Sequence, residues 1–586
     1  MKYQMLVSIL DKIRDEAPDK QAKTYRPDSS DIEKVNAARS RSYIHLYLKV
    51  SFGLMSFVER ERFITDGSYD GGIDGYYIDK ESKQIYIMQS KFRTTKDNFE
   101  SKEISYDEIL CMDVDNILGG NDCDDNGNSY NGKIKQLQRE ISELSDIARY
   151  SYKVIILANL KGIPQNRLKK LTDGYASIVF DHTRTYNELV FPVVSGTLFT
   201  AHDICIPMDL SNKNAGSKIS YTVKTKVSDC EITVLFAPVI EIAKIMNKYK
   251  NSILKYNPRS YLELEGQIVN NSIRKTVLGS ETNEFALYNN GITMISDETY
   301  INERIGQKNK AQLSVKNPQI INGGQTSYIL SRIYEENLDN DVEAIFDGKE
   351  VLLKVITLID NDSHADKLEL IDAISEATNK QTPVINADRF ANDSIHQKVQ
   401  KKVFDKYGLL YERKRGEFAD GLKSGYIEPY QVIERNLFLR IYFSANGHIN
   451  QGSQKKLFQK NSLSNLRLTD EELHRFFIAY HVFNALTGRL QKRNHHLNLR
   501  RINKSHYAKL YYYNELFPDG NLDALSDNLF ALELKWGEFM KYAIEVNSGI
   551  KKYWFRNDGQ ITAFNEDKYY NSERLEQDLI NYNNIK

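Results

Sequence analysis

Cysteine, long hydrophobic runs and an excess of either charge are what this sequence lacks. Four cysteines occur in 586 residues without a CxxC spacing, which argues against a disulfide framework or structural zinc and fits a reducing compartment. The first apolar run is too short and too soon charged for a signal peptide, and no stretch reaches the ~18 to 20 apolar residues of a membrane span. We therefore expect a cytoplasmic protein with no membrane partner.

The charges of the chain balance, with 79 lysines and arginines against 79 aspartates and glutamates. A zero net charge provides no global positive field to steer a polyanion, so any surface for nucleic acid must be a local patch. Hydrophobic residues make up 41% and charged residues 27%, which is typical of a folded globular chain.

The hydrophobic pattern predicts more than one domain. Residues 1 to about 60 read as mostly helical, and between 63 and 194 short apolar runs alternate with helical stretches. This pattern predicts an α/β domain over residues 1–200, a mixed sheet flanked by helices with strands buried on both faces. Residues 201–232 read as a connection, and residues 233–586 as a mixed α+β unit that becomes largely helical towards the C-terminus.

Residues 66–91 read DGSYDGGIDGYYIDKESKQIYIMQSK. Successive side chains of a strand point to opposite faces, so one face of IYIMQSK carries two isoleucines and then Gln89 and Lys91. Either this strand emerges into solvent at Gln89, or the polar pair lines a cleft. A hairpin with GYYID would bring Asp74 close to both residues.

A carboxylate, an amide oxygen and a lysine on one cleft can hold a hard cation and activate its water. Asp66 and Asp70, in the glycine-rich turn, are candidates for further negative charge. The alternative for these turn aspartates, above all for Asp66, is that they accept hydrogen bonds from their own backbone.

The motif D…QxK after a GGID turn resembles the active-site hairpin of the PD-(D/E)xK restriction-endonuclease-like nucleases, in the variant with glutamine at the acidic position. The resemblance implies Mg²⁺ or Mn²⁺ as cofactor, held by Asp74, Gln89 and the Ser90 carbonyl. Asp70 is a further candidate ligand, because its charge would compensate for the neutral Gln89. It implies that Lys91 is the catalytic lysine. Such nucleases often carry a further acid on a preceding helix, for which Glu33 and Glu59 are the candidates here.

Two glycine turns mark the second unit, NNG at residues 289–291 and NGGQT at residues 322–326. The second is preceded by a strand pattern and followed by a helix pattern, so its amides are candidates for an anion-binding helix start. The candidate ligand-binding residues are Asn290, Asn322, Gln325 and Thr326. The lysine of a P-loop is absent, and purely structural turns are the alternative.

These turns belong to an ordered set of motifs that resembles the AIPR family, the abortive-infection phage-resistance proteins. The set consists of NSIRKTVLG, LYNNGIT, INGGQT, ATNKQTPV and YERKRGEF. The resemblance extends to the hairpin at residues 66–91, and it implies a role in bacterial defence against phage. A phage-derived or nucleotide trigger and an oligomeric assembly are open alternatives.

A basic and aromatic segment follows at residues 487–514. Clustered basic side chains beside tyrosines suit phosphate contacts and base stacking, and a solvated helix face is the alternative. The candidate nucleic-acid-binding residues are Arg489, Lys492, Arg493, Arg500, Arg501 and Lys504.

The leading hypothesis is a metal-dependent nuclease, with DNA favoured over RNA as substrate, fused to a sensing or recognition unit. The first alternative is a nucleic-acid-binding or scaffold protein that keeps a degenerate, non-cleaving nuclease fold. The second is that the two glycine turns form a nucleotide-phosphate site that regulates or carries the activity.

Overall fold

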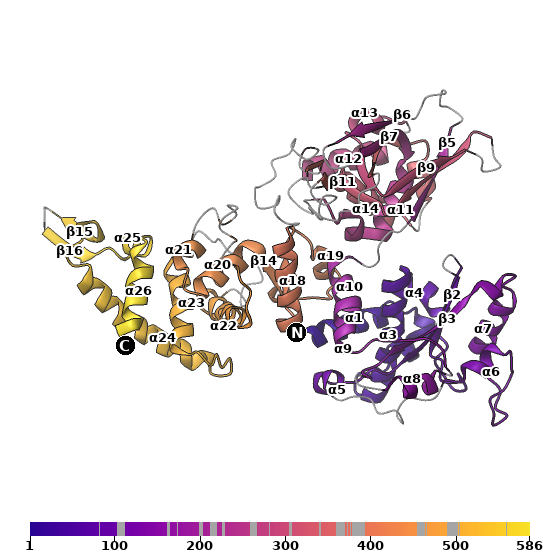
Figure 1. Cartoon of the computed structure of the whole chain (residues 1–586), viewed down its shortest axis with the longest axis horizontal. Helices are drawn as coiled ribbons and strands as arrows, with labels where there is room; N and C mark the ends of the chain where they lie inside the picture. Colours follow the sequence, from indigo (N-terminus) through magenta and orange to yellow (C-terminus); the bar gives the residue numbers. More distant parts are fainter. Residues whose placement is uncertain are drawn as a thin grey trace. The chain divides into compact units, whose positions relative to one another are not determined.

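The computed structural model (Figure 1) describes most of the chain. The described residues are 1–80, 83–101, 112–160, 164–172, 174–197, 203–210, 219–225, 229–257, 267–279, 282–303, 308–338, 341–358, 370–371, 373–374, 377, 393–453, 457, 463, 466–488, 502, 504–557 and 560–585. No described helix is long and apolar enough to cross a membrane.

Helices form most of the first sixty residues, as the sequence predicts. They are α1 (Lys2–Asp15), α2 (Ala22–Tyr25), α3 (Ile32–Phe52) and α4 (Phe57–Glu61). The helix α3 ends at Gly53, whose φ of +66° is a left-handed conformation that glycine adopts without strain. The side chains of the second half of α3 are almost all buried, so this helix is a wall of the core and not a surface element.

A four-stranded mixed sheet follows, in the order β1-β2-β3-β4. Its strands are β1 (Gly75–Asp79), β2 (Gln84–Ser90), β3 (Ser151–Leu157) and β4 (Ser177–Val179). The pair β1/β2 is antiparallel, whereas β2/β3 and β3/β4 are parallel. Gly75 pairs with Met88, which confirms the predicted hairpin.

Helices cover this sheet, and the predicted mixed sheet flanked by helices is therefore confirmed for the N-terminal part. Ile85, Ile87, Val154 and Ile156 of the strands join one hydrophobic cluster with buried residues of α6 (Val114–Leu118) and α7 (Gly132–Ser142). The helix α3 contacts β2, so the strand is buried from both sides. The segment between α6 and the start of α7 consists mostly of turns and is mostly exposed.

Two sheets form the next part of the chain. One has the order β5-β10-β9 and the other β11-β8-β12-β7-β6. The strands, in chain order, are β5 (Asp203–Asp209), β6 (Ile219–Lys224), β7 (Asp229–Pro238), β8 (Ile292–Ser296), β9 (Glu298–Asn302), β10 (Lys310–Lys316), β11 (Gln319–Asn322) and β12 (Glu350–Leu358). Ordered strands, β5 and β6, thus occupy described parts of the segment expected as a connection.

Two helices pack against each other in this region, α11 (Val239–Tyr249) and α14 (Gly324–Glu336). Strand β7 leads directly into α11, and the strand, glycine turn and helix predicted at NGGQT are confirmed by β11, Gly323 and α14. Helix α12 (Gln267–Gly279) lies between these elements in the sequence.

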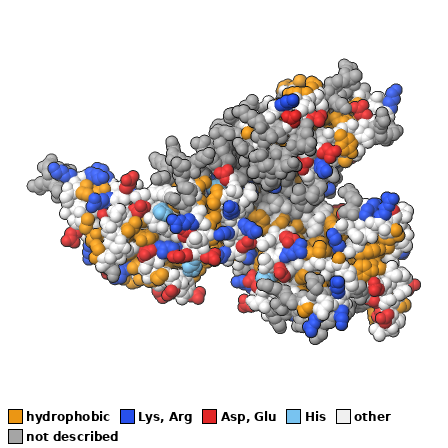
Figure 2. Space-filling view, in the orientation of Figure 1, with side chains coloured by type: hydrophobic (Ala, Val, Ile, Leu, Met, Phe, Trp, Pro, Cys, Tyr) orange, Lys and Arg blue, Asp and Glu red, His pale blue; other side chains and the backbone are white. Residues whose placement is uncertain are grey.

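By its internal contacts the chain divides into two compact units, Met1–Pro383 with Lys414–Ile427, and Val384–Arg413 with Glu428–Lys586. The second of these two compact units is largely helical, as predicted for the C-terminal region. Its longer helices are α18 (Ser394–Tyr407), α20 (Arg435–Ala445), α22 (Asp470–Thr487), α23 (Lys504–Leu516), α24 (Leu525–Val546) and α26 (Arg574–Ile585). Basic and acidic side chains are interspersed over the face of the molecule seen in Figure 2, in agreement with the zero net charge.

Candidate metal centre

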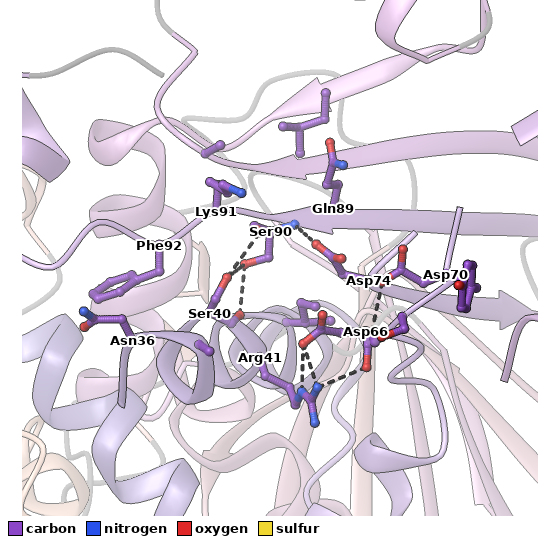
Figure 3. Close-up of a pocket in the computed structure, with 17 residues that line it drawn as sticks. Asn36, Ser40, Arg41, Asp66, Asp70, Asp74, Gln89, Ser90, Lys91 and Phe92 are labelled. Carbon is purple, nitrogen blue, oxygen red and sulfur yellow. Dashed lines mark hydrogen bonds and ion pairs between the residues drawn. The ribbon is translucent and has the colours of Figure 1, made fainter. Parts of the chain in front are cut away.

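A pocket of about 580 Å³ opens beside the β1/β2 hairpin (Figure 3). Its walls come from α3, the glycine-rich turn before β1, the end of β2, and β3. The lining residues are Asn36, Ala37, Ser40, Arg41, Ile44, Asp66, Gly67, Ser68, Tyr69, Asp70, Asp74, Gln89, Ser90, Lys91, Phe92, Ile156 and Ala158. All four residues that the hairpin motif singled out, Asp74, Gln89, Ser90 and Lys91, are therefore brought to one pocket.

Asp74 is fixed by the strand pairing. Its backbone N–H donates to the Met88 carbonyl at 2.8 Å, and its Oδ2 accepts a hydrogen bond from the backbone N–H of Ser90 at 2.7 Å. The backbone carbonyl of Asp74 accepts from the amides of Thr65 and Asp66 at 3.0 and 3.1 Å. The hairpin thus holds this carboxylate at the sheet edge by main-chain contacts on both sides.

Three carboxylates converge there, those of Asp66, Asp70 and Asp74. One oxygen of each lies within 4.8 Å of the other two. Asp70 accepts hydrogen bonds from the backbone amides of Gly67 and Gly72 at 3.0 and 2.9 Å, which is the turn role that the sequence analysis assigned most readily to Asp66. Asp66 instead forms an ion pair with Arg41 of α3 at 2.9 Å.

The electrostatics of this trio oppose its own ionisation. Burial raises the pKa of the Asp74 carboxyl well above its usual value, and the nearby charges of Asp66 and Asp70 raise it further. The amide of Ser90 and the ammonium of Lys91 act in the opposite direction. Burial likewise raises the pKa of Asp70, with a contribution from Asp66. A bound cation would relieve this repulsion between like charges.

The donor set fits a hard divalent cation. Mg²⁺ and Mn²⁺ prefer carboxylate and carbonyl oxygens, and Mg²⁺ keeps several waters when protein ligands are few. Asp66, Asp70 and Asp74 are the residues that could hold such an ion. They are also the only group of three or more acids, histidines and cysteines at this spacing in the described part of the chain.

Gln89 and Lys91 follow one another on the strand face that the alternation predicts. Figure 3 shows both side chains pointing to one side of β2 and Ser90 to the other, towards Ser40 of α3. Gln89 is 6% exposed, whereas Lys91 is exposed at the pocket mouth. The Ser90 hydroxyl donates to the Ser40 carbonyl at 2.9 Å, which fastens the end of β2 to α3. Lys91 thus lines the pocket with an exposed ammonium, and a catalytic role for it stays a prediction.

The acidic residue that was expected on a helix preceding the hairpin is not among the residues that line the pocket. Neither Glu33 nor Glu59 lines the pocket, and both are exposed. The α3 face that reaches the pocket carries Asn36, Ser40 and Arg41 instead. These three residues were not predicted as part of the site, although their spacing along one helical face, followed by Ile44 one turn later, was a usable signal.

The two glycine turns of the later part touch each other. At Gly323 (φ +81°) a Cβ would lie 2.9 Å from the Gly291 carbonyl oxygen, and at Gly291 (φ +83°) it would lie 2.8 Å from the carbonyl oxygen of Leu352. Asn289 donates from Nδ2 to the Thr326 hydroxyl at 3.2 Å. Close packing therefore explains the glycine at both positions, because a side chain would clash with the neighbouring backbone.

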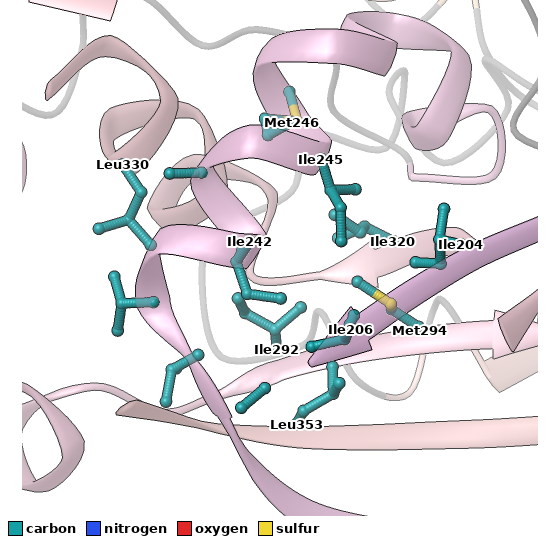
Figure 4. Packing of buried hydrophobic residues seen from close by; sticks show 14 of the residues in the cluster. Ile204, Ile206, Ile242, Ile245, Met246, Ile292, Met294, Ile320, Leu330 and Leu353 are labelled. Atoms are coloured by element: carbon teal, nitrogen blue, oxygen red, sulfur yellow. The ribbon is translucent and has the colours of Figure 1, made fainter. Parts of the chain in front are cut away.

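The strands that lead to these turns are anchored in a common core. Ile292 of β8 and Ile320 of β11 pack with Ile242 of α11 and Leu330 of α14 (Figure 4). The Asn322 side chain accepts from the backbone N–H of Gly323 at 2.7 Å. A ligand role for Asn290, Asn322, Gln325 and Thr326 stays a prediction.

Most of the predicted nucleic-acid-binding residues lie outside the described residues, namely Arg489, Lys492, Arg493, Arg500 and Arg501. Lys504 is described, and its ammonium is buried. It donates to Asn450 Oδ1 and to the Ser572 carbonyl, the latter at 2.6 Å. Burial lowers the pKa of Lys504. Its side chain thus serves contacts within the chain.

The last of the ordered motifs, YERKRGEF, contains a second buried lysine. Lys414 is 4% exposed and donates to the carbonyls of Leu254, Lys255 and Asn257 at 3.1, 2.8 and 2.7 Å. Its own backbone N–H donates to Glu417. The motif therefore ties the chain after β13 (Leu410–Glu412) back to the residues that follow α11.

Residues 254–518 match the model of the AIPR protein family. The match contains NNG, NGGQT and YERKRGEF, whose contacts are given above, and it also contains ATNKQTPV, of which only Ala377 is described. The hairpin pocket lies N-terminal to the matched AIPR segment. No curated protein and no solved structure matches the chain.

Proposed function

We propose that this protein is a metal-dependent nuclease that acts in defence against phage. The observation that carries the first part is the convergence of Asp66, Asp70 and Asp74 in one pocket with Lys91. The AIPR match over residues 254–518 supports the second part, since that family is associated with abortive infection.

Six residues of the pocket would have a part in phosphodiester hydrolysis. Asp66, Asp70 and Asp74 would hold Mg²⁺ or Mn²⁺. The Gln89 side chain and the Ser90 carbonyl, which accepts from the Ser40 hydroxyl at 3.2 Å, would be further oxygen donors. The bound ion supplies Lewis acidity and lowers the pKa of a water. Water would form the new bond to phosphorus and lose a proton to the solvent, while the bond to the leaving oxygen breaks and that oxygen takes a proton from the solvent. Lys91 stabilises the negative charge that develops on the phosphoryl oxygens.

The decisive experiment is cleavage of plasmid DNA and of a single-stranded RNA by the purified protein with Mg²⁺, Mn²⁺ or EDTA. Asp74→Asn and Lys91→Ala are the test variants. Asp79→Asn and Lys80→Ala are matched controls, because they remove the same charges from the far end of the same hairpin. Cleavage that needs metal, disappears in the test variants and persists in the controls establishes the nuclease.

A second candidate is a nucleic-acid-binding scaffold with a non-cleaving pocket. Three observations favour it: Gln89 is neutral, α3 contributes no acid, and Asp66 is neutralised by Arg41. Phage plating on cells that express the wild type or Asp74→Asn separates the two. Protection that survives in Asp74→Asn, with wild-type levels of protein, would favour the scaffold over the nuclease.

A further inference from the structure

Tyr69 stands apart from the other aromatic side chain of the pocket. Phe92 is buried and stacks on Tyr3 with ring centroids 6.2 Å apart. Tyr69 is 59% exposed, and within the described residues its ring and hydroxyl have no partner. An aromatic face at the edge of the carboxylate pocket is thus open to whatever enters.

The backbone conformation at Tyr69 is one that a tyrosine rarely adopts in a turn. Its φ is +59°, a left-handed conformation in which glycine and asparagine are favoured and a bulky residue is strained. Gly71 and Gly72 nearby adopt positive φ values of +63° and +71°. A third glycine or an asparagine would suit this backbone better, so the conformation of the turn does not account for a tyrosine here.

The turn is nevertheless held in place. The Asn131 backbone N–H donates to the Tyr69 carbonyl at 2.9 Å, and its side chain donates to the carbonyl of Thr65 at 3.0 Å. The Asp113 backbone N–H donates to the Gly71 carbonyl at 2.8 Å. An exposed ring on an anchored loop loses little conformational freedom when a flat ligand stacks on it.

We propose that Tyr69 stacks on an unpaired base of the nucleic acid, so that the strand enters the pocket single-stranded. This inference rests on the proposed nuclease function and names the form of its substrate. In a duplex both faces of an internal base are already covered by its neighbours, whereas an unpaired base offers a face to the tyrosine. Tyr69, the three carboxylates and Lys91 line one pocket, so the phosphate next to the stacked base would lie near the cation that the carboxylates would hold.

The pairing of basic side chains near the pocket agrees with a single-stranded nucleic acid as substrate. Duplex binding draws most of its affinity from many phosphate contacts to lysine and arginine. Around this pocket Arg41 is committed to Asp66, and Arg39, on the same helix, is paired with Asp11 at 2.8 Å. Stacking supplies affinity that does not depend on such a basic surface.

The test is a binding titration by fluorescence anisotropy with labelled single-stranded DNA, single-stranded RNA of the same sequence, and the DNA duplex. Ca²⁺ is the cation, and a gel confirms that each strand stays intact. The variants are Tyr69→Asn, which suits the left-handed backbone, and Tyr69→Trp, which keeps an aromatic face. Tyr300→Asn is the matched control, since Tyr300 is 56% exposed on β9, outside the lining of the pocket.

We expect Tyr69→Asn to weaken binding of at least one single strand by roughly 5- to 150-fold, the range typical for loss of one base–aromatic stack. Duplex binding should be unchanged, and Tyr69→Trp should bind like the wild type. The melting temperature of Tyr69→Asn should not fall, because the new residue fits the backbone. A purely structural tyrosine would give a lower melting temperature and equal losses on all substrates.

Single-strand affinity that is the same in Tyr69→Asn and the wild type would overturn the inference, and so would an equal loss on the duplex. Because the readout is binding, it remains decisive when no cleavage occurs, whereas failure of the nuclease proposal is seen only in the cleavage assay.

Discussion

Arg41 holds Asp66 by two hydrogen bonds, from Nε to Oδ2 at 2.9 Å and from Nη2 to the backbone carbonyl at 3.0 Å. The guanidinium also lies over the ring of Tyr25, 5.8 Å from its centroid. The Tyr25 hydroxyl in turn donates to Glu61 and contacts His45, which is buried. The first carboxylate of the trio is therefore oriented by a network that reaches through α3 into the core.

Replacement of Arg41 should destabilise the protein in a metal-dependent way. In Arg41→Ala, Asp66 loses its counter-ion while Asp70 and Asp74 still repel it, so we expect a loss of about 1 to 3 kcal/mol in the free energy of unfolding in EDTA. Saturating Mn²⁺ should restore part of this loss. Arg62→Ala is the control, because its exposed pair with Glu140 should contribute less than about 1 kcal/mol. Urea titrations with and without Mn²⁺ measure both quantities.

The raised pKa values of Asp70 and Asp74 predict the pH dependence of the metal-free protein. The folded state binds these protons more tightly than the unfolded chain, in which an aspartate has a pKa of about 3.8. The stability that they contribute is complete below that pH and is lost as the pH rises through the folded pKa. In EDTA, the wild type should therefore lose stability relative to Asp74→Asn as the pH rises above about 4.

Metal affinity should change with pH in the opposite sense. The cation competes with protons for the carboxylates, so the affinity for Mn²⁺ should increase as the pH rises above about 4. Isothermal titration calorimetry at several pH values measures this trend. A pH-independent affinity would contradict the assignment of Asp74 and Asp70 as ligands.

Gln89→Glu should strengthen metal binding and weaken the metal-free fold. A fourth carboxylate adds negative charge around the cation, and we expect roughly tenfold tighter Mn²⁺ binding. Without metal the new charge is buried beside three others, so the melting temperature in EDTA should fall. Gln84→Glu is the control at the opposite end of β2. Equal behaviour of the two variants would remove Gln89 from the site.

Lys414→Met should be strongly destabilising although it is distant in sequence from the pocket. The variant removes three charge-assisted hydrogen bonds and leaves the carbonyls of Leu254, Lys255 and Asn257 without this donor. We expect a loss of about 2 to 4 kcal/mol in the free energy of unfolding, measured by urea titration. Lys423→Met, at an exposed lysine, should stay within about 0.5 kcal/mol of the wild type.

Local patterns determined the elements of the candidate site. The alternation in IYIMQSK and the glycine-rich turn before Asp74 predicted the hairpin, and Gly75 does pair with Met88. The strand, turn and helix around Gly323 and the helical C-terminal region could be predicted for the same reason. Hydrophobic period and turn chemistry act over a few residues, and those residues are adjacent in the sequence.

Only the tertiary structure decided which side chains meet. Arg41 and Asp66 are 25 positions apart, and their ion pair depends on how α3 packs on β2. The contact between Gly291 and Gly323 and the burial of Lys504 likewise follow from packing between distant segments. Such contacts form when whole hydrophobic faces are buried together, and no local signal records which face a helix will meet. The sequence by itself therefore determined the hairpin that carries Asp74, and the tertiary structure decided that α3 completes its pocket with an arginine.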